Sequence, residues 1–307
     1  MISLILIKKI FSLFLMMFMG FLLVKSGKLR SQDSKIINIL TAYVIFPCIV
    51  LSSFNISYNR EILLGMLLSL IVCVIMFAVQ QVFIVALKKP LKIQPTEHAC
   101  IVYPNTGNLI IPLVSYILGS EYVIYCSVYM CFFMLLMWSH GKAILSGESK
   151  LDISILTNIN IIALFVGLAM FLFKLHFPAP IQDAIDTIGS ITGPIVMLIM
   201  GMLIADINVE KLKQYKRLPL VVALRMLVLP ILIILAYKLA RLDGFCENAE
   251  GIMLIAVMSA SAPTASTITQ LALLFGADEG YANLITLVCT LVCILTMPLM
   301  VLIYQAF

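Results

Sequence analysis

Long apolar stretches separated by short polar connections run along the whole chain. A helix needs about 20 predominantly apolar residues to cross the hydrocarbon core of a bilayer, and ten stretches approach that length. Their limits are 4–24, 36–54, 62–87, 97–118, 122–145, 157–177, 184–205, 218–239, 251–275 and 281–304. Because the connections are short, the pattern predicts an all-α membrane protein of ten transmembrane helices without a soluble domain.

The composition supports this prediction. Hydrophobic residues make up 63% of the 307 residues and charged residues 11%, whereas a soluble domain carries roughly 25% charge. A soluble enzyme, a disordered protein and a secreted disulfide scaffold are therefore all disfavoured. The chain has no Walker sequence, no catalytic pair and no basic nucleic-acid motif. The eight cysteines and three histidines lack metal-ligand spacing, so we expect no enzyme activity, no metal and no cofactor.

The distribution of basic residues predicts the orientation. Of the 20 Lys and Arg residues, 13 lie in connections after odd-numbered spans, six lie on the opposite side, and Arg225 lies within a span. The side richer in Lys and Arg faces the cytoplasm. We therefore expect both termini outside, with the 207–217 connection inside, and a location in the bacterial inner (plasma) membrane.

The two halves of the chain, 1–146 and 155–307, each hold five predicted spans and resemble each other. An offset of 147 residues places Pro47 on Pro194, and an offset of 159 places Pro104 on Pro263. Five is an odd number, so the second half enters the membrane from the opposite side. The pattern predicts an inverted repeat in which spans 4 and 9 are broken and cross each other.

A proline inside a helix removes one backbone donor and clashes with the preceding turn. We therefore expect helix breaks at Pro104 and Pro263. A new helix start leaves N–H groups without partners and carries partial positive charge. Two such starts that meet inside the membrane would suit an anion, such as a carboxylate.

Polar side chains follow each break, and they have two possible roles. They could bind the substrate, or they could cap the freed backbone. The ligand role is favoured for Asn105, and packing or capping for the hydroxyl groups. The candidates are Asn105, Thr106, Asn108, Ser266 and Thr267.

Four further polar residues lie in or next to the spans. Gln80 and Gln81 in span 3 need hydrogen-bond partners, and one of them could face a cavity. Arg225 in span 8 could act on the substrate or in gating, or it could snorkel. Glu97 opens span 4 and is interpreted as an acid near the helix N-cap, with a gating role as the alternative. No Asp or Glu lies within two residues of either central proline, so the usual acidic group for ion coupling is missing there.

Four segments of the sequence resemble the auxin efflux carrier family, which includes the plant PIN carriers and bacterial permeases. They are Phe46–Phe54, Pro104-Asn105-Thr106 with Ile111-Pro112-Leu113, Ser259–Ala265, and Met297-Pro298-Leu299. The resemblance implies an inverted five-span repeat in which spans 1, 2, 6 and 7 form a scaffold and homodimer interface. Spans 3–5 and 8–10 would form a transport domain that moves like an elevator, with Asn105 holding a substrate carboxylate.

Together these observations predict a secondary active or facilitative transporter of small organic anions, such as malate-like, malonate-like or auxin-like acids, in the lipid bilayer. The short connection between spans 5 and 6 favours a bacterial-type permease. The alternatives are a sodium-coupled symporter of the related bile-acid type and a membrane receptor that does not transport.

Overall fold

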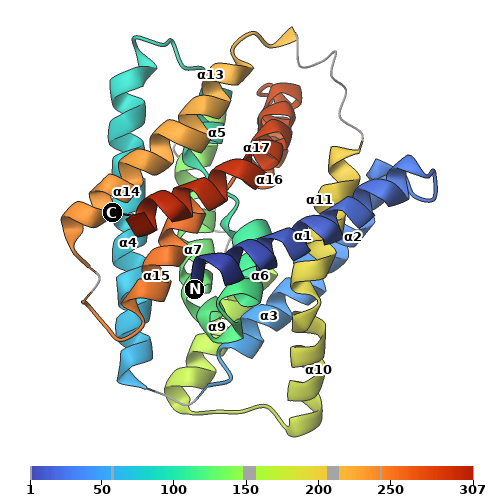
Figure 1. Cartoon of the computed structure of the whole chain (residues 1–307), viewed down its shortest axis with the longest axis vertical. Coiled ribbons are helices and arrows are strands. Elements are labelled where there is room, and N and C mark those ends of the chain that lie inside the picture. The colour runs from blue at the N-terminus through green and yellow to red at the C-terminus, as the bar shows by residue number, and fades with distance from the viewer. Residues whose placement is uncertain (1, 57–58, 148–156, 206–213, 243, 307) are drawn as a thin grey trace. The chain divides into compact units, whose positions relative to one another are not determined.

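The computed structural model describes residues 2–56, 59–147, 157–205, 214–242 and 244–306, without the side chains of residues 2–10, Phe14 and Asn108. Within this part every named element is helical (Figure 1); η denotes 3-10 and π segments. The elements are α1 (Ile2–Lys25), η1 (Ser31–Asp33), α2 (Ser34–Leu40), η2 (Thr41–Ile45), α3 (Phe46–Ser53), α4 (Arg60–Lys88), α5 (Pro95–Val102), η3 (Thr106–Ile110), α6 (Ile111–Ile117), η4 (Ser120–Tyr122), α7 (Val123–Leu136), η5 (Met137–Gly141), α8 (Lys142–Ser146), α9 (Ile159–Phe173), α10 (Ala179–Ser190), α11 (Thr192–Ile204), α13 (Leu218–Ala223), η7 (Leu224–Val228), α14 (Leu229–Ala240), α15 (Ala249–Ala260), α16 (Ser266–Leu274) and α17 (Glu279–Ala306).

Six helical stretches of the described chain are long and apolar enough to cross a membrane. They are Ser31–Ser53, Arg60–Lys88, Ser120–Ser146, Ala179–Ile204, Leu218–Ala240 and Glu279–Ala306. Each of the ten predicted ranges overlaps helical residues, but α9 has 15 residues and ranges 97–118 and 251–275 are divided. The chain is thus an all-helical integral membrane protein with several spans, and the count of ten stays a prediction.

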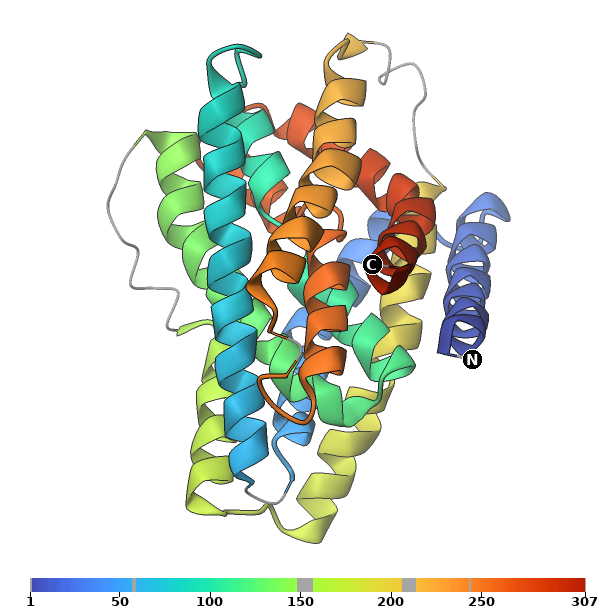
Figure 2. The same ribbon diagram turned by 60° about the vertical axis from the view of Figure 1, so that its left-hand side comes forward.

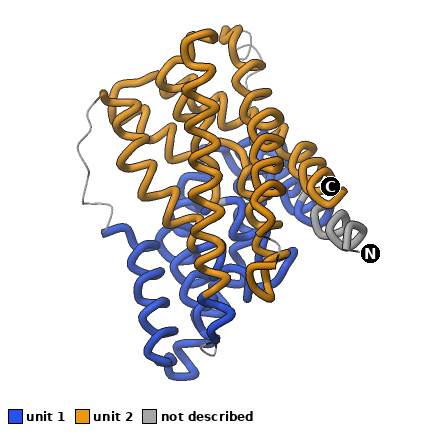
Figure 3. Tube along the Cα trace, turned by 90° about the vertical axis from the view of Figure 1, so that its left-hand side faces the viewer, with its two compact units in different colours: residues 1–63, 107–127, 154–207 blue, residues 64–106, 128–153, 208–307 orange. Residues whose placement is uncertain are grey.

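The chain divides into two compact units, coloured separately in Figure 3. Unit 1 comprises residues 1–63, 107–127 and 154–207, and unit 2 comprises 64–106, 128–153 and 208–307. Unit 1 contains predicted spans 1, 2, 6 and 7, and unit 2 contains spans 3, 8, 9 and 10. Span 4 is shared, because the boundary falls between Thr106 and Gly107; most of span 5 belongs to unit 2.

Small residues bring the helices of unit 1 into close contact. Helix α1 packs along α11 (Figure 1), where a Cβ on Gly20 would meet the Leu198 carbonyl and one on Gly201 the Met17 carbonyl. Glycine at both positions lets the two backbones touch. Helices α9 and α10 pack against α3.

Pro47 and Pro194 both lie next to irregular helix geometry in unit 1. The π segment η2 precedes Pro47 in the first turn of α3, and the junction of α10 and α11 at Ile191 precedes Pro194. A π segment relieves the clash between a proline and the preceding turn. Neither proline therefore separates its helix into two distant halves.

Unit 2 is built on long helices. Helix α4 is uninterrupted over 29 residues, as Figure 2 shows, and α17 continues through Pro298 over 28 residues. The unit packs around large buried side chains, and the hydroxyl group of a buried tyrosine among them hydrogen-bonds to a backbone carbonyl. The Tyr237 hydroxyl donates to the Val72 carbonyl at 3.3 Å.

The predicted connection at 207–217 lies partly outside the described residues. Three lysines used to predict the orientation, Lys150, Lys211 and Lys213, lie wholly outside them.

Candidate functional site

The first helix break lies in unit 2, between α5 and η3. Helix α5 ends at Val102, and Tyr103 has extended backbone angles of φ −93° and ψ 111°. A proline disfavours helical angles in the residue before it, so Pro104 stops the helix at Tyr103. Helical structure resumes at Thr106.

The second break lies around Pro263 in the other half of the sequence. Helix α15 ends at Ala260, and α16 starts at Ser266 after Ala265, whose angles of φ −65° and ψ 130° are extended. Pro263 lies between the two helices. Both breaks are therefore where proline chemistry places them.

The two breaks lie side by side and pair with each other. Pro104 and Thr264 form an antiparallel bridge. The Asn105 N–H donates to the Pro263 carbonyl at 2.8 Å, and the Ala265 N–H donates to the Tyr103 carbonyl at 3.0 Å. These two N–H groups are therefore used in the pairing and are not free to bind an anion.

Side chains satisfy carbonyl groups that the breaks leave open. Pro104 has no N–H for the Cys100 carbonyl four residues earlier; instead, the Thr264 hydroxyl donates to this carbonyl at 2.8 Å. Cys293 Sγ donates to the Ser261 carbonyl at 3.7 Å. Buried carbonyls need partners in a membrane interior, so these contacts make the breaks tolerable.

Arg225 completes this arrangement. Its side chain is fully buried, and its guanidinium donates to the Ile101 carbonyl at 3.2 Å and to the Ala262 carbonyl at 2.7 Å. These carbonyls lie at the C-terminal ends of the two broken helices, where the helix dipole is negative. Arg225 therefore does not snorkel; it joins both helix ends. It brings a positive charge to the paired segments 103–105 and 263–265, here called the crossing.

The side chains beyond the breaks differ in exposure. Asn105 and Thr106 are buried, at 5% and 3% exposure, and Ser266 and Thr267 are partly exposed. The four belong to the two segments that the bridge brings together. The side chain of Asn108 lies outside the described residues.

Glu97 lies at the start of α5, away from the bridge. Its carboxylate accepts two bonds from Arg217, at 2.7 and 2.9 Å, and one from the Tyr281 hydroxyl at 3.1 Å. It also accepts the Gln94 N–H as part of a capping box. This fully buried acid is thus a helix cap that ties α5 to α17.

Gln80 and Gln81 lie on α4. Gln80 is fully buried, and within the described chain neither atom of its amide has a hydrogen-bond partner. Gln81 is partly exposed, and its Nε2 is also without a partner there. The partners that two amides in a membrane helix require are thus not found among the protein groups described.

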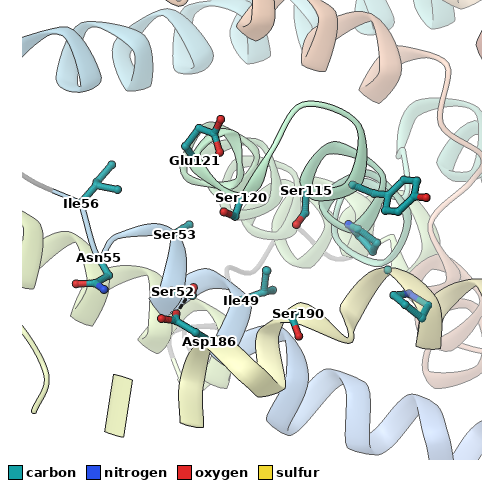
Figure 4. A pocket seen from close by; sticks show the side chains of 14 residues that line it. Ile49, Ser52, Ser53, Asn55, Ile56, Ser115, Ser120, Glu121, Asp186 and Ser190 are labelled. Carbon is teal, nitrogen blue, oxygen red and sulfur yellow. Dashed lines mark hydrogen bonds between the residues drawn. The ribbon is translucent and has the colours of Figure 1, made fainter. Parts of the chain in front are cut away.

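A second polar feature is a pocket of about 530 Å³ within unit 1 (Figure 4). Serines from α3, α6 and α10 line it, together with Pro112 and Pro194. Its two charged lining residues, Glu121 and Asp186, are both acidic. Asp186 accepts hydrogen bonds from Ser52 and Gln182. The charge of this pocket opposes an anion, whereas the charge at the crossing favours one.

Sequence reasoning identified the prolines and the residues after them but missed two features of the crossing. One is the partner of the Thr264 hydroxyl, because the Cys100 carbonyl is 164 residues away in the sequence. The other is the clamp by Arg225, whose sequence distances to Ile101 and Ala262 are 124 and 37 residues. An arginine in an apolar span was the available clue.

A helical membrane protein with two discontinuous helices that meet inside the protein has the architecture of secondary transporters. The chain belongs to the membrane transport protein family, which it matches over residues 5–155 and 153–301. This match confirms the resemblance to the auxin efflux carrier family. No curated protein matches the chain. The family consists of membrane transporters, so it places the protein among transporters and not among enzymes.

Proposed function

We propose that the protein is a secondary transporter of small organic anions and that it binds a substrate carboxylate beside the crossing. The observation that carries this proposal is the bridge between Pro104 and Thr264. It pairs the two breaks in antiparallel register, and a helical segment starts beyond each end of the pairing, at Thr106 and at Ser266.

The charge at the crossing supports an anionic substrate. Each helical start carries partial positive charge. Arg225 adds its guanidinium, which binds the carbonyl of Ile101 shortly before Pro104 and the carbonyl of Ala262 directly before Pro263. The partners of Arg225 in the described chain are carbonyls and not carboxylates. Arg225 therefore has no carboxylate partner there. The negative ends of the two helices offset part of its charge, and the remaining charge attracts an anion more strongly in a low-dielectric site than it would in water.

The polar residues after the breaks supply directional contacts. We propose that Asn105 donates to the carboxylate and that Thr106, Asn108, Ser266 and Thr267 complete the site. Gln80 and Gln81 are less suited to this role, because they lie on α4 and no contact between them and the crossing is described.

We further propose that transport moves unit 2 as an elevator against unit 1. The grouping of predicted spans 1, 2, 6 and 7 in one unit supports this proposal. A homodimer through the helices of unit 1 belongs to the same proposal. So does the orientation with both termini outside.

The direct test is flux of labelled malonate into proteoliposomes, preceded by a thermal-shift screen against small organic acids. We expect a dicarboxylate or monocarboxylate to stabilise the protein and to enter the vesicles. Malonamide, which has the same skeleton without carboxylates, is the control and should do neither. Stabilisation by neutral amides to the same degree would contradict carboxylate recognition.

The prolines provide a matched set of variants. Alanine at Pro104 or Pro263 restores an N–H that competes for the helical carbonyl and allows the helix to continue, so flux should fall at least ten-fold in membranes with normal protein levels. Pro298 lies inside the continuous helix α17, and Pro298→Ala should retain most of the flux. Equal flux in all three variants would remove the crossing from the mechanism.

A further inference from the structure

Two of the three histidines lie together in unit 2. His98 is on α5, and His140 is on η5. Their ring centroids are 6.0 Å apart. His140 also packs edge-on against Phe77 of α4, at 5.5 Å, one turn before Gln80 and Gln81.

This cluster holds polar groups that the protein does not satisfy. His98 is 6% exposed, and Gln80 is fully buried. Within the described chain neither ring nitrogen of His98 and neither amide atom of Gln80 has a hydrogen-bond partner. Buried polar groups normally have partners, so unpartnered groups of this kind in a transporter indicate a site for a small polar species.

The hydrogen bonds of Tyr103 indicate which nitrogen of His140 is open. The Tyr103 hydroxyl lies 3.1 Å from the Leu136 carbonyl and 2.8 Å from His140 Nδ1. A carbonyl can only accept, so the single hydroxyl proton goes to Leu136. The Tyr103 oxygen then accepts Nδ1–H of His140, and the other nitrogen, Nε2, is left as an acceptor.

Tyr103 also connects this cluster to the crossing. The same residue accepts the Ala265 N–H through its carbonyl, in the bridge between the two breaks. One residue therefore contacts the histidine pair with its side chain and the second break with its backbone. The side chain of Tyr103 thus links the pair to the backbone of the crossing.

We propose that His98 and His140 form a proton-binding site that couples proton movement to transport; this rests on the proposed function. The proton binds at Nε2 of His140 or at a ring nitrogen of His98. Two positive charges at this separation repel each other, so the pair holds one proton at a time. A bound proton attracts the substrate anion, and by reciprocity the anion strengthens proton binding. The pair thereby supplies the ionisable group that no acid provides beside the central prolines.

The other charged groups around the pair are already engaged or lie outside the cluster. Glu97 is paired with Arg217 and Tyr281, Arg225 is held by two carbonyls, and Lys142 lies over the ring of Phe275. Lys88 at the end of α4 is exposed and acts on His98 over a longer distance. Tyr103 contacts the pair directly, and Glu97 precedes His98 on α5. The elements packed against α5 carry Lys142, Arg225 and Tyr281.

Histidine NMR tests the site without any substrate. Purified protein with labelled histidine gives three signals, which His98→Gln, His140→Gln and His176→Gln assign; His176 is exposed in unit 1. We expect at least one signal of the pair to titrate between pH 4 and 9, and His98→Gln to move the His140 midpoint to higher pH. The reciprocal measurement in His140→Gln covers the case in which His98→Gln does not fold. Unchanged midpoints, or no titration by either residue, would overturn the proposal.

Transport tests the coupling. With malonate as the probe, a gradient of one pH unit and the membrane potential clamped at zero, one proton per malonate dianion gives up to about ten-fold accumulation. The double variant His98→Gln/His140→Gln should exchange malonate at equal pH but no longer accumulate it, whereas His176→Gln should behave as wild type. Accumulation in the double variant, or accumulation driven by a sodium gradient alone, would refute coupling through the pair. Absence of malonate flux in wild type contradicts the proposed function, and the NMR titration then decides the histidine site by itself.

Discussion

Asn105 lies directly after the first break, and its substitutions separate substrate binding from helix capping. A lost hydrogen bond to a charged group costs roughly 1.5–3 kcal/mol, so Asn105→Ala should weaken carboxylate binding about ten- to a hundred-fold. Asn105→Asp keeps the shape and the capping ability but places two like charges in a low-dielectric site, and it should nearly abolish binding. Affinity measured by thermal shift against malonate checks both variants.

Asn160 provides the control for this comparison, because it is a buried asparagine of unit 1 that donates to the Ala42 carbonyl. Asn160→Asp should leave the affinity of folded protein unchanged. If Asn105→Asp binds the anion as well as wild type, Asn105 is a cap and not a ligand.

Thr264 acts at the same scale through one hydroxyl group. Thr264→Val keeps the volume but leaves the buried Cys100 carbonyl without its donor, so we expect a loss of about 1–3 kcal/mol in stability. Thr286 of α17 donates to the carbonyl four residues earlier in its own helix, and Thr286→Val should have little effect. Thermal unfolding in detergent measures the difference, and equal effects would argue against the role of Thr264 as a carbonyl partner.

Helix packing in unit 1 depends on the glycines that let α1 and α11 touch. A Cβ at Gly201 would overlap the Met17 carbonyl, so Gly201→Ala must push the two helices apart. Overpacking of this kind typically costs about 1–3 kcal/mol, and thermal unfolding should show that loss. Gly244 has no heavy atom within 4 Å of an added Cβ, so Gly244→Ala is the neutral control. A stable Gly201→Ala protein would mean that the α1–α11 contact adjusts freely.

The two broken helices supply hydrogen-bond partners to each other at their breaks. Each proline ends its helix by local chemistry, but neither break could stay buried alone, because its carbonyls would lack partners. Pairing the two breaks satisfies one donor of each, and Thr264, Cys293 and Arg225 satisfy further carbonyls. The two halves of the sequence therefore stabilise each other at this point.

At the scale of the whole molecule, the orientation remains open to a direct test. Cys48, Cys131 and Cys246 are partly exposed, so they are first replaced by alanine. An impermeant thiol reagent should then label a cysteine added after Phe307 and should not label Gln214→Cys until the membrane is permeabilised. The reverse pattern would invert the predicted topology, while labelling of both sites in sealed cells would contradict the odd number of spans, three, that is predicted between them.

Local sequence features are enough to predict a helical membrane protein whose helices break at Pro104 and Pro263. Both follow from local chemistry: apolar runs prefer the bilayer, and proline stops the helix in which it lies. The polar residues Asn105, Thr106, Ser266 and Thr267 are candidates for the same reason, since they follow the breaks in the sequence, and their role in binding stays a prediction. Glu97 was predicted as an acid near the helix N-cap from its place at the start of span 4, and its carboxylate accepts the Gln94 N–H.

The tertiary structure alone decided which distant groups meet. Thr264 and the Cys100 carbonyl are 164 residues apart in the sequence, and Arg225 reaches a carbonyl 124 residues away. His140 and Tyr103, 37 residues apart, likewise share no helical register. Hydropathy and proline spacing describe one segment at a time, whereas these contacts exist because packing brings separate helices together and buried polar groups then require partners.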